Sequence, residues 1–78
     1  MITIWTWDGC PTCYIAKEIL KENGIPFIDK RLGVDFTTEE LMNALGKPDL
    51  PQFTENGTYI GNLEVFMNNI ERFKGKQQ

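Results

Sequence analysis

The stretch TWDGCPTCYIAKEIL, residues 6–20, leads from a strand into a helix through a turn that holds two cysteines. Branched or aromatic residues alternate with Thr in ITIWTW, residues 2–7, which is typical of a strand. Gly9 and Pro11 mark the turn, and Pro11 suits the first turn of a helix, where a missing N–H costs nothing. We therefore expect a strand that passes directly into a helix, with both cysteines at the junction.

Helical periodicity continues beyond the cysteines and returns later in the chain. Residues 12–24 carry an apolar stripe, and Gly24 suits the position just after the helix. The stripe consists of Ile15, Ala16, Ile19 and Leu20. Residues 26–32 predict a short strand. Thr37, followed three residues later by Glu40, has the spacing of a capping box and predicts a second helix that ends at Gly46. Its apolar side consists of Leu41, Met42 and Leu45.

The last third of the chain predicts a hairpin and a final helix. Asn56-Gly57 suits the tight turn between two short strands within residues 47–61. Asn62 can then cap one helix over residues 63–74. Its apolar residues are interpreted as core packing; they are Leu63, Phe66, Met67, Ile70 and Phe73. The order is thus β-α-β-α-β-β-α, an α/β fold with a mixed four-stranded sheet and helices on both faces.

Length and composition limit the function classes. The 78 residues predict a single domain over 1–78, and 41% apolar with 24% charged residues is an ordinary globular balance. A net charge of −3 argues against a nucleic-acid partner. We find no signal peptide and no apolar run of the ~20 residues that would span a membrane, so we expect a cytoplasmic protein. We also expect a monomer, because no long exposed apolar strand is evident.

Cys10 and Cys13 form a C-x-x-C motif at the predicted helix start, and three kinds of site use such a pair. Zinc needs about four ligands, and the chain has no His and no further Cys, so no metal site is predicted. A structural disulfide across so short a loop stabilises a protein by only about 2 kcal/mol, and the cytosol would reduce it. Redox catalysis is favoured, because the N-terminus of a helix stabilises the thiolate of Cys10 and leaves Cys13 within reach to resolve a mixed disulfide.

Three segments together resemble a glutaredoxin, a member of the thioredoxin-fold superfamily. They are CPTCYIAKEIL near the start, LPQF in the middle and NGTYIGNLEVF before the last helix, in the family's order and spacing. The resemblance implies a thioredoxin-like fold and a dithiol–disulfide oxidoreductase that holds no bound cofactor. Glutathione would be its reducing co-substrate, and disulfide-containing proteins, with ribonucleotide reductase as a typical example, would be its partners.

The resemblance also implies roles for individual residues. Cys10 would attack the substrate disulfide and Cys13 would resolve the intermediate. The Leu50-Pro51 bond would be cis, although for an isolated sequence a trans bond is the default, and Leu50 would pair its backbone with glutathione. The remaining substrate-binding residues are Thr12, Tyr14, Gly61, Asn62 and Glu64, with Glu64 facing the ammonium group of glutathione.

Several positions depart from the family pattern and weaken the expectation of tight glutathione binding. Trp7 stands where many glutaredoxins have a lysine, and Asn62 replaces the second glycine of a G-G pair. Thr12 replaces the usual aromatic residue between the cysteines. Asp8 and Asp49 add negative charge near the site, which opposes thiolate formation and an anionic ligand. We name Lys30, Arg31 and Lys47 as cations able to offset that charge.

Two other functions stay open at this point. One is a glutaredoxin-like thioredoxin reduced by a flavoprotein reductase. The other is a non-enzymatic binding protein that uses the Cys10–Cys13 pair as a redox switch. Trp7, Tyr14 and Leu50 either form an apolar rim for a partner protein or, in the case of Trp7 and Tyr14, simply pack inside.

Overall fold

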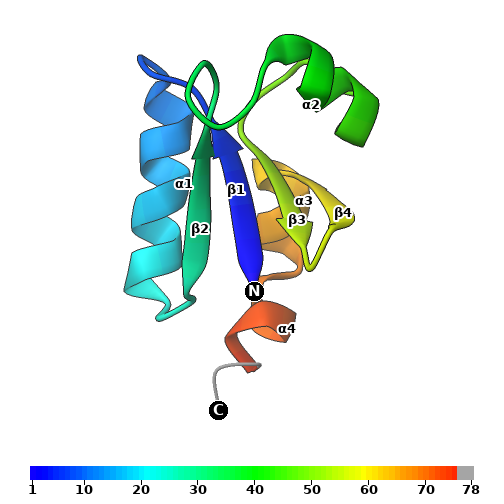
Figure 1. The fold of residues 1–78 in the computed structure, drawn as a ribbon. Helices are drawn as coiled ribbons and strands as arrows, with labels where there is room; N and C mark the ends of the chain where they lie inside the picture. The colour runs from blue at the N-terminus through cyan, green and yellow to red at the C-terminus, as the bar shows by residue number, and fades with distance from the viewer. Residues whose placement is uncertain (76–78) are drawn as a thin grey trace.

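The computed structural model describes residues 1–75 and contains one four-stranded sheet with helices on both faces (Figure 1). The strands are β1 (Ile2–Thr6), β2 (Phe27–Arg31), β3 (Gln52–Glu55) and β4 (Thr58–Asn62). The helices are α1 (Pro11–Glu22), α2 (Thr38–Leu45), α3 (Leu63–Asn68) and α4 (Ile70–Gly75). The predicted α/β fold is confirmed.

The sheet has the strand order β2-β1-β3-β4. β1 and β2 are parallel, because α1 crosses over between them, whereas β1–β3 and β3–β4 are antiparallel. Asn56 and Gly57 both have positive φ, at 52° and 86°, as the predicted tight hairpin turn requires. The C-terminal end of β1 therefore opens into the cysteine turn, next to the chain that enters β3.

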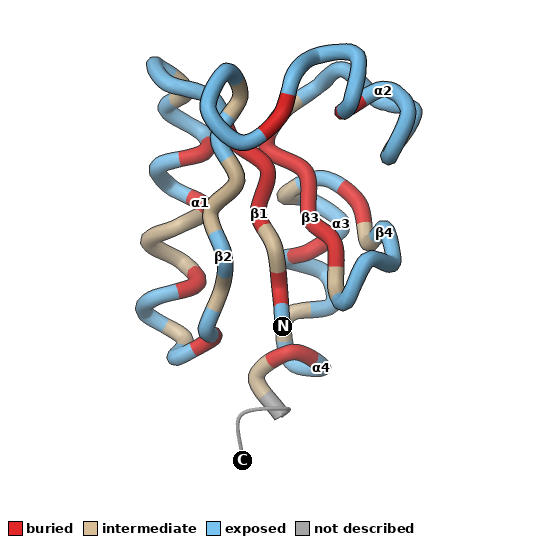
Figure 2. The backbone as a smooth tube through the Cα atoms, in the orientation of Figure 1, coloured by how far each residue is buried: buried red, intermediate tan, exposed pale blue. Residues whose placement is uncertain are grey.

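Each face of the sheet has its own apolar core. Figure 2 shows that the buried residues are concentrated along the central strands β1 and β3. The larger core lies between the sheet and α1, α3 and α4, and its rings stack: the centroids of Phe53 and Phe66 are 4.3 Å apart, and those of Phe66 and Phe73 are 4.8 Å apart. The smaller core packs Trp5 of β1 against Phe36 and against Leu41 of α2. These cores fix the ends of β1 and β3, which position the site.

The caps that the sequence predicts for α1 and α2 are present. Thr37 and Glu40 form the complete capping box of α2, and Gly46 ends that helix with φ 71°. Gly24, with φ 67°, follows the end of α1 as expected.

The exposure of three apolar residues differs from the prediction. Ile15, Met42 and Met67 are exposed rather than part of the core. In α1 the residues that face the sheet are Cys13, Ala16 and Leu20, a spacing of three and four that places Ile15 on the other side of the helix. Met42 and Met67 lie on the flanks of α2 and α3, beside the buried Leu41 and Phe66.

The single final helix predicted over residues 63–74 is wrong, because Asn69 divides it into α3 and α4. The side-chain Nδ2 of Asn69 donates a hydrogen bond of 2.8 Å to the carbonyl of Val65, and its backbone N–H donates to the carbonyl of Phe66. The side chain thereby takes the acceptor that a continuous helix would offer to the backbone. The interpretation as core holds for Phe66 and Phe73, with Leu63 and Ile70 partly buried against them.

Candidate functional site

Cys10 and Cys13 are joined by a disulfide at the N-terminus of α1, with their Cα atoms 5.2 Å apart. Cys10 is the N-cap residue, and its Sγ accepts a hydrogen bond of 3.0 Å from the backbone N–H of Cys13. Cys10 is partly exposed, whereas Cys13 is only 1% exposed and lies on the buried face of α1. An incoming group therefore meets the sulfur of Cys10 first, and that sulfur lies where backbone N–H groups stabilise negative charge.

A polar network ties the end of β1 to α1 and β2. The Asp29 carboxylate accepts hydrogen bonds of 2.7 Å from the Thr6 hydroxyl and 3.0 Å from the Lys17 ammonium. Burial by itself raises the pKa of Asp29, but the bond from Thr6, the bond and charge of Lys17 and the charge of Arg31 outweigh it. The pKa is therefore held below its ordinary value. Thr6 stands immediately before the turn that carries Cys10, so the network anchors the base of that turn.

The turn before Cys10 is exposed and carries both an aromatic and an acidic side chain. Trp7 is 45% exposed and Tyr14, just after Cys13, is 65% exposed, so neither simply packs inside. The Asp8 carboxylate lies 3.4 Å from Nε of Arg31. Of the three cations named from the sequence, Arg31 is therefore the one paired with Asp8, while the ammonium of Lys30 lies 4.4 Å from the centroid of the Trp5 ring.

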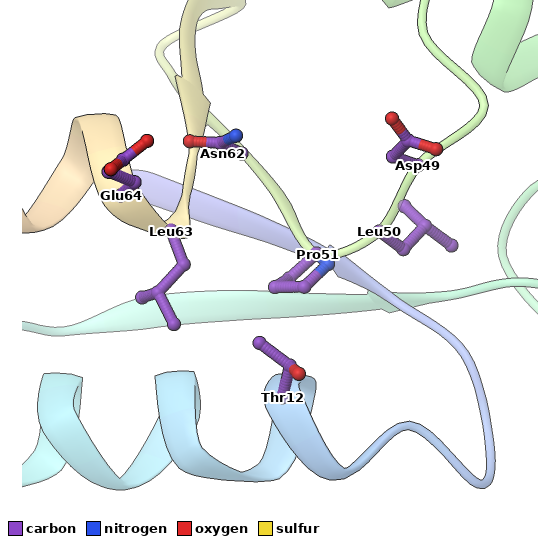
Figure 3. Close-up of a pocket in the computed structure, with 7 residues that line it drawn as sticks. All are labelled: Thr12, Asp49, Leu50, Pro51, Asn62, Leu63 and Glu64. Carbon is purple, nitrogen blue, oxygen red and sulfur yellow. The ribbon is translucent and has the colours of Figure 1, made fainter.

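A pocket of about 210 Å³ opens beside the cysteine motif (Figure 3). Its lining comes from α1, from the segment before β3 and from the β4–α3 junction. The lining residues are Thr12, Asp49, Leu50, Pro51, Asn62, Leu63 and Glu64. Five of them are substrate-binding residues predicted from the sequence, which the fold brings together from three separate segments. Tyr14 and Gly61, also predicted, are not among the lining residues.

The two other lining residues, Asp49 and Leu63, are not among the residues predicted to bind substrate. Leu63 was assigned to the core only, because its helical spacing matches that of Phe66. Asp49 was noted only for its charge. Their positions gave the signal that was missed, since each directly adjoins a predicted binding residue, Leu50 or Asn62.

Two local features shape the pocket wall, a cis peptide bond and a side-chain helix cap. The Leu50-Pro51 peptide bond is cis, as the resemblance implies, and Pro51 is buried at the entry to β3. On the other side, Oδ1 of Asn62 accepts a hydrogen bond of 3.1 Å from the N–H of Val65 and caps α3. The Oδ1 atom of Asn62 is therefore already hydrogen-bonded to α3, the helix that carries Leu63 and Glu64.

Comparison with known proteins decides the family. A protein-family model described as Glutaredoxin matches residues 2–60, most of the chain. The chain belongs to the glutaredoxin family. As a glutaredoxin it is a thiol–disulfide oxidoreductase, and Cys10-x-x-Cys13 is its redox-active pair.

Individual relatives agree with this assignment. A probable glutaredoxin from Synechocystis sp. is 35% identical over 65 residues, covering 81% of this glutaredoxin and 74% of that protein. Glutaredoxin 3 from Escherichia coli is 29% identical over 66 residues, covering 81% and 77%. A hybrid peroxiredoxin from Haemophilus influenzae is 37% identical over 60 residues, but the matched segment is only 25% of that longer protein.

Solved structures share the fold of this glutaredoxin. The buckwheat glutaredoxin–glutathione complex superposes with a TM-score of 0.77 at 17% identity, covering 94% of this chain and 70% of that one. Glutaredoxin 1 from Francisella tularensis, complexed with cacodylate, gives 0.71 at 23% identity, covering 91% and 92%.

Residues 1–75 lack two further features. No group of three or more His, Cys, Asp or Glu side chains is placed to hold a metal ion there. Over the same part of the chain, no helix is both long enough and apolar enough to cross a membrane.

Proposed function

We propose that this glutaredoxin is a glutathione-linked dithiol–disulfide oxidoreductase in which Cys10 attacks and Cys13 resolves. The Cys10 thiolate attacks one sulfur of a substrate disulfide and releases the first thiol. The Cys13 thiolate then attacks Cys10, releases the second thiol and forms the Cys10–Cys13 disulfide. Two molecules of glutathione reduce that disulfide and leave as oxidised glutathione, so each cycle transfers two electrons.

The unequal exposure of the two cysteines carries this proposal. Cys10 is partly exposed at the helix N-terminus, whereas Cys13 is 1% exposed but close enough to bond to it. A nucleophile must reach a bulky disulfide, while a resolving thiol needs only to reach its neighbour.

The pocket beside the motif supports glutathione as the reductant. Its lining combines the apolar side chains of Leu50, Pro51 and Leu63 with polar side chains that include Thr12 and Glu64 (Figure 3). A short peptide has both kinds of group, and Glu64 is free to face its ammonium. The buckwheat glutaredoxin, whose fold this chain shares, is itself complexed with glutathione.

The protein partners follow from the same chemistry. We propose that the substrates are disulfide-containing proteins, with ribonucleotide reductase as one candidate. A peroxiredoxin is another, because a relative of this chain forms part of a hybrid peroxiredoxin. The exposed Trp7 and Tyr14 flank the cysteines and would contact such a partner. We further propose that the protein acts as a cytoplasmic monomer.

The test is NADPH consumption with a small disulfide as substrate, supplied either with glutathione and glutathione reductase or with thioredoxin reductase alone. We expect turnover only with glutathione, and expect it to disappear in Cys10→Ser. Absence of Cys10-dependent turnover in both systems would contradict the enzymatic mechanism and favour a redox-switch binding protein.

The thioredoxin-reductase system also tests a second candidate, a glutaredoxin-like thioredoxin. Its supporting observation is that none of the seven residues lining the pocket is a cation that would bind the carboxylates of glutathione, and Trp7 replaces the family's lysine. Turnover with thioredoxin reductase alone would favour this candidate.

A further inference from the structure

We propose that the pocket selects disulfides that carry a positive charge beside the reacting sulfur, such as an ammonium or guanidinium on the thiol fragment. The inference rests on the proposed attack by Cys10 and assigns Asp49 and Glu64 as the residues that determine this specificity. It does not depend on which reductant restores the dithiol.

The charge on the pocket wall is the first observation. Asp49 and Glu64 are the only ionisable residues among the seven that line it, and both are exposed. Figure 3 shows their carboxylates on the same side of Pro51 as Asn62, with Thr12 on the opposite side. A ligand in this pocket therefore meets two negative charges above an apolar surface of Leu50, Pro51 and Leu63.

The state of the neighbouring cations is the second observation. Arg31 pairs with Asp8 and Asp29, and Lys17 pairs with Asp29. Among residues 1–75, no ion pair involves Asp49 or Glu64. The two carboxylates thus keep their charge available to a ligand, in a chain whose net charge is already −3.

The shape of the favoured substrate follows from the lining. A short aliphatic segment that ends in a cation buries its methylene groups on the apolar surface and brings the charge to the rim. An aminothiol, or a cysteine next to Lys or Arg in a peptide, has this form. A fragment whose only charged group is a carboxylate meets like charges and reacts more slowly, whereas glutathione also carries an ammonium that Glu64 can face.

The proposed selectivity enters at the first chemical step. The Cys10 thiolate forms a bond to one sulfur of the disulfide, and the other sulfur leaves as a thiolate that takes a proton from solvent. The retained fragment occupies the pocket until Cys13 displaces it, which completes the two-electron reduction of the substrate and the oxidation of the protein. A charge on the retained fragment is thus beside Asp49 and Glu64 during both displacements.

The experiment is a single-turnover reaction of the full chain, reduced beforehand and freed of reductant. It is mixed with excess cystamine, bis(2-hydroxyethyl) disulfide or 3,3′-dithiodipropionate, which are cationic, neutral and anionic. Loss of protein thiols gives the rate. Each rate is divided by that of the same disulfide with 2-mercaptoethanol, which removes differences in intrinsic reactivity.

We expect the normalised rate to be roughly tenfold higher for the cationic than for the anionic disulfide at low ionic strength. The ratio should approach one in about 1 M salt, where the Debye length is about 3 Å. Asp49→Asn and Glu64→Gln should each lower the ratio about threefold. Glu22→Gln, which removes the same charge at the far end of α1, should not change it.

Three results would overturn the inference. They are equal normalised rates for all three disulfides, a ratio that does not respond to salt, and a ratio that Asp49→Asn and Glu64→Gln leave unchanged. Each can occur while the neutral disulfide still reacts, so the proposed function survives them. No Cys10-dependent reaction with any of the three would instead refute the proposed attack itself.

Discussion

Gly61 and Val65 lie so close together that a Cβ on Gly61 would stand 2.7 Å from the Cβ of Val65. Gly61 has φ 146°, a backbone conformation that side chains rarely allow, and it directly precedes the cap of α3. This contact lets β4 turn at once into α3. As a result, Asn62 and Glu64 face the pocket from a junction with no intervening loop.

Replacing Gly61 should therefore be costly. We expect Gly61→Ala to lower the free energy of unfolding by about 2–4 kcal/mol, since it adds a clash to a strained backbone. Gly46→Ala is the matched control, because Gly46 also has positive φ but has no atom within 4 Å of an added Cβ; about 1 kcal/mol is expected there. Urea denaturation measures both, and equal losses would show that the contact with Val65 is unimportant.

The aromatic stack makes Phe66 the centre of the larger core. Its ring lies between those of Phe53 and Phe73, and all three residues are buried. Phe66→Ala should lower the free energy of unfolding by about 3–5 kcal/mol. Met67→Ala, one residue away but exposed, should cost less than about 1 kcal/mol by the same measurement. A similar cost for the two variants would contradict this description of the core.

The network around Asp29 should make stability depend on pH. Because the folded state lowers the pKa of Asp29, its contribution is fully present above the ordinary pKa and is lost as the pH falls through the folded value. We expect Asp29→Asn to lower the free energy of unfolding by about 1 kcal/mol at neutral pH. The difference from wild type should shrink between about pH 5 and pH 2.

Urea denaturation of wild type and Asp29→Asn at a series of pH values tests this dependence. Asn keeps an oxygen able to accept the bond from Thr6, so the variant mainly removes charge. A difference that stays constant from neutral to acidic pH would show that ionisation of Asp29 does not stabilise the fold.

The unequal exposure of the cysteines predicts which one is trapped by a substrate. Cys13→Ser treated with oxidised glutathione should gain one glutathione, attached to Cys10, because no second thiol resolves the adduct. Cys10→Ser should gain little under the same conditions, since Cys13 is 1% exposed. Intact mass measurement distinguishes the two, and faster modification of Cys13 would reverse the assigned roles.

Local signals in the sequence predicted most of the fold. The Thr37–Glu40 capping box and the Asn56-Gly57 turn need only neighbouring residues, and both are present. The division of the last helix at Asn69 was missed because the apolar spacing continues across it. Only the three-dimensional position of the Asn69 side chain shows that it takes the carbonyl of Val65.

The candidate site was predictable to a different extent. The motif around Cys10 locates the redox pair, because two cysteines at this spacing at the start of a helix can form and exchange a disulfide. The pocket is assembled from α1, the entry to β3 and the β4–α3 junction, so its membership depends on packing between distant segments. Leu63 shows the consequence: its spacing indicates core, yet it lies where the core meets the pocket.

The direction of β1 has a consequence for how this domain combines with others. The chain starts at the N-terminal end of β1 and reaches α4 near that same end, whereas Cys10 follows the opposite end of the strand (Figure 1). Additional polypeptide joined before β1 or after α4 would therefore emerge away from the disulfide. Such an arrangement suits a portable electron-transfer module, able to be fused to the enzyme it serves without blocking its own reactive sulfur.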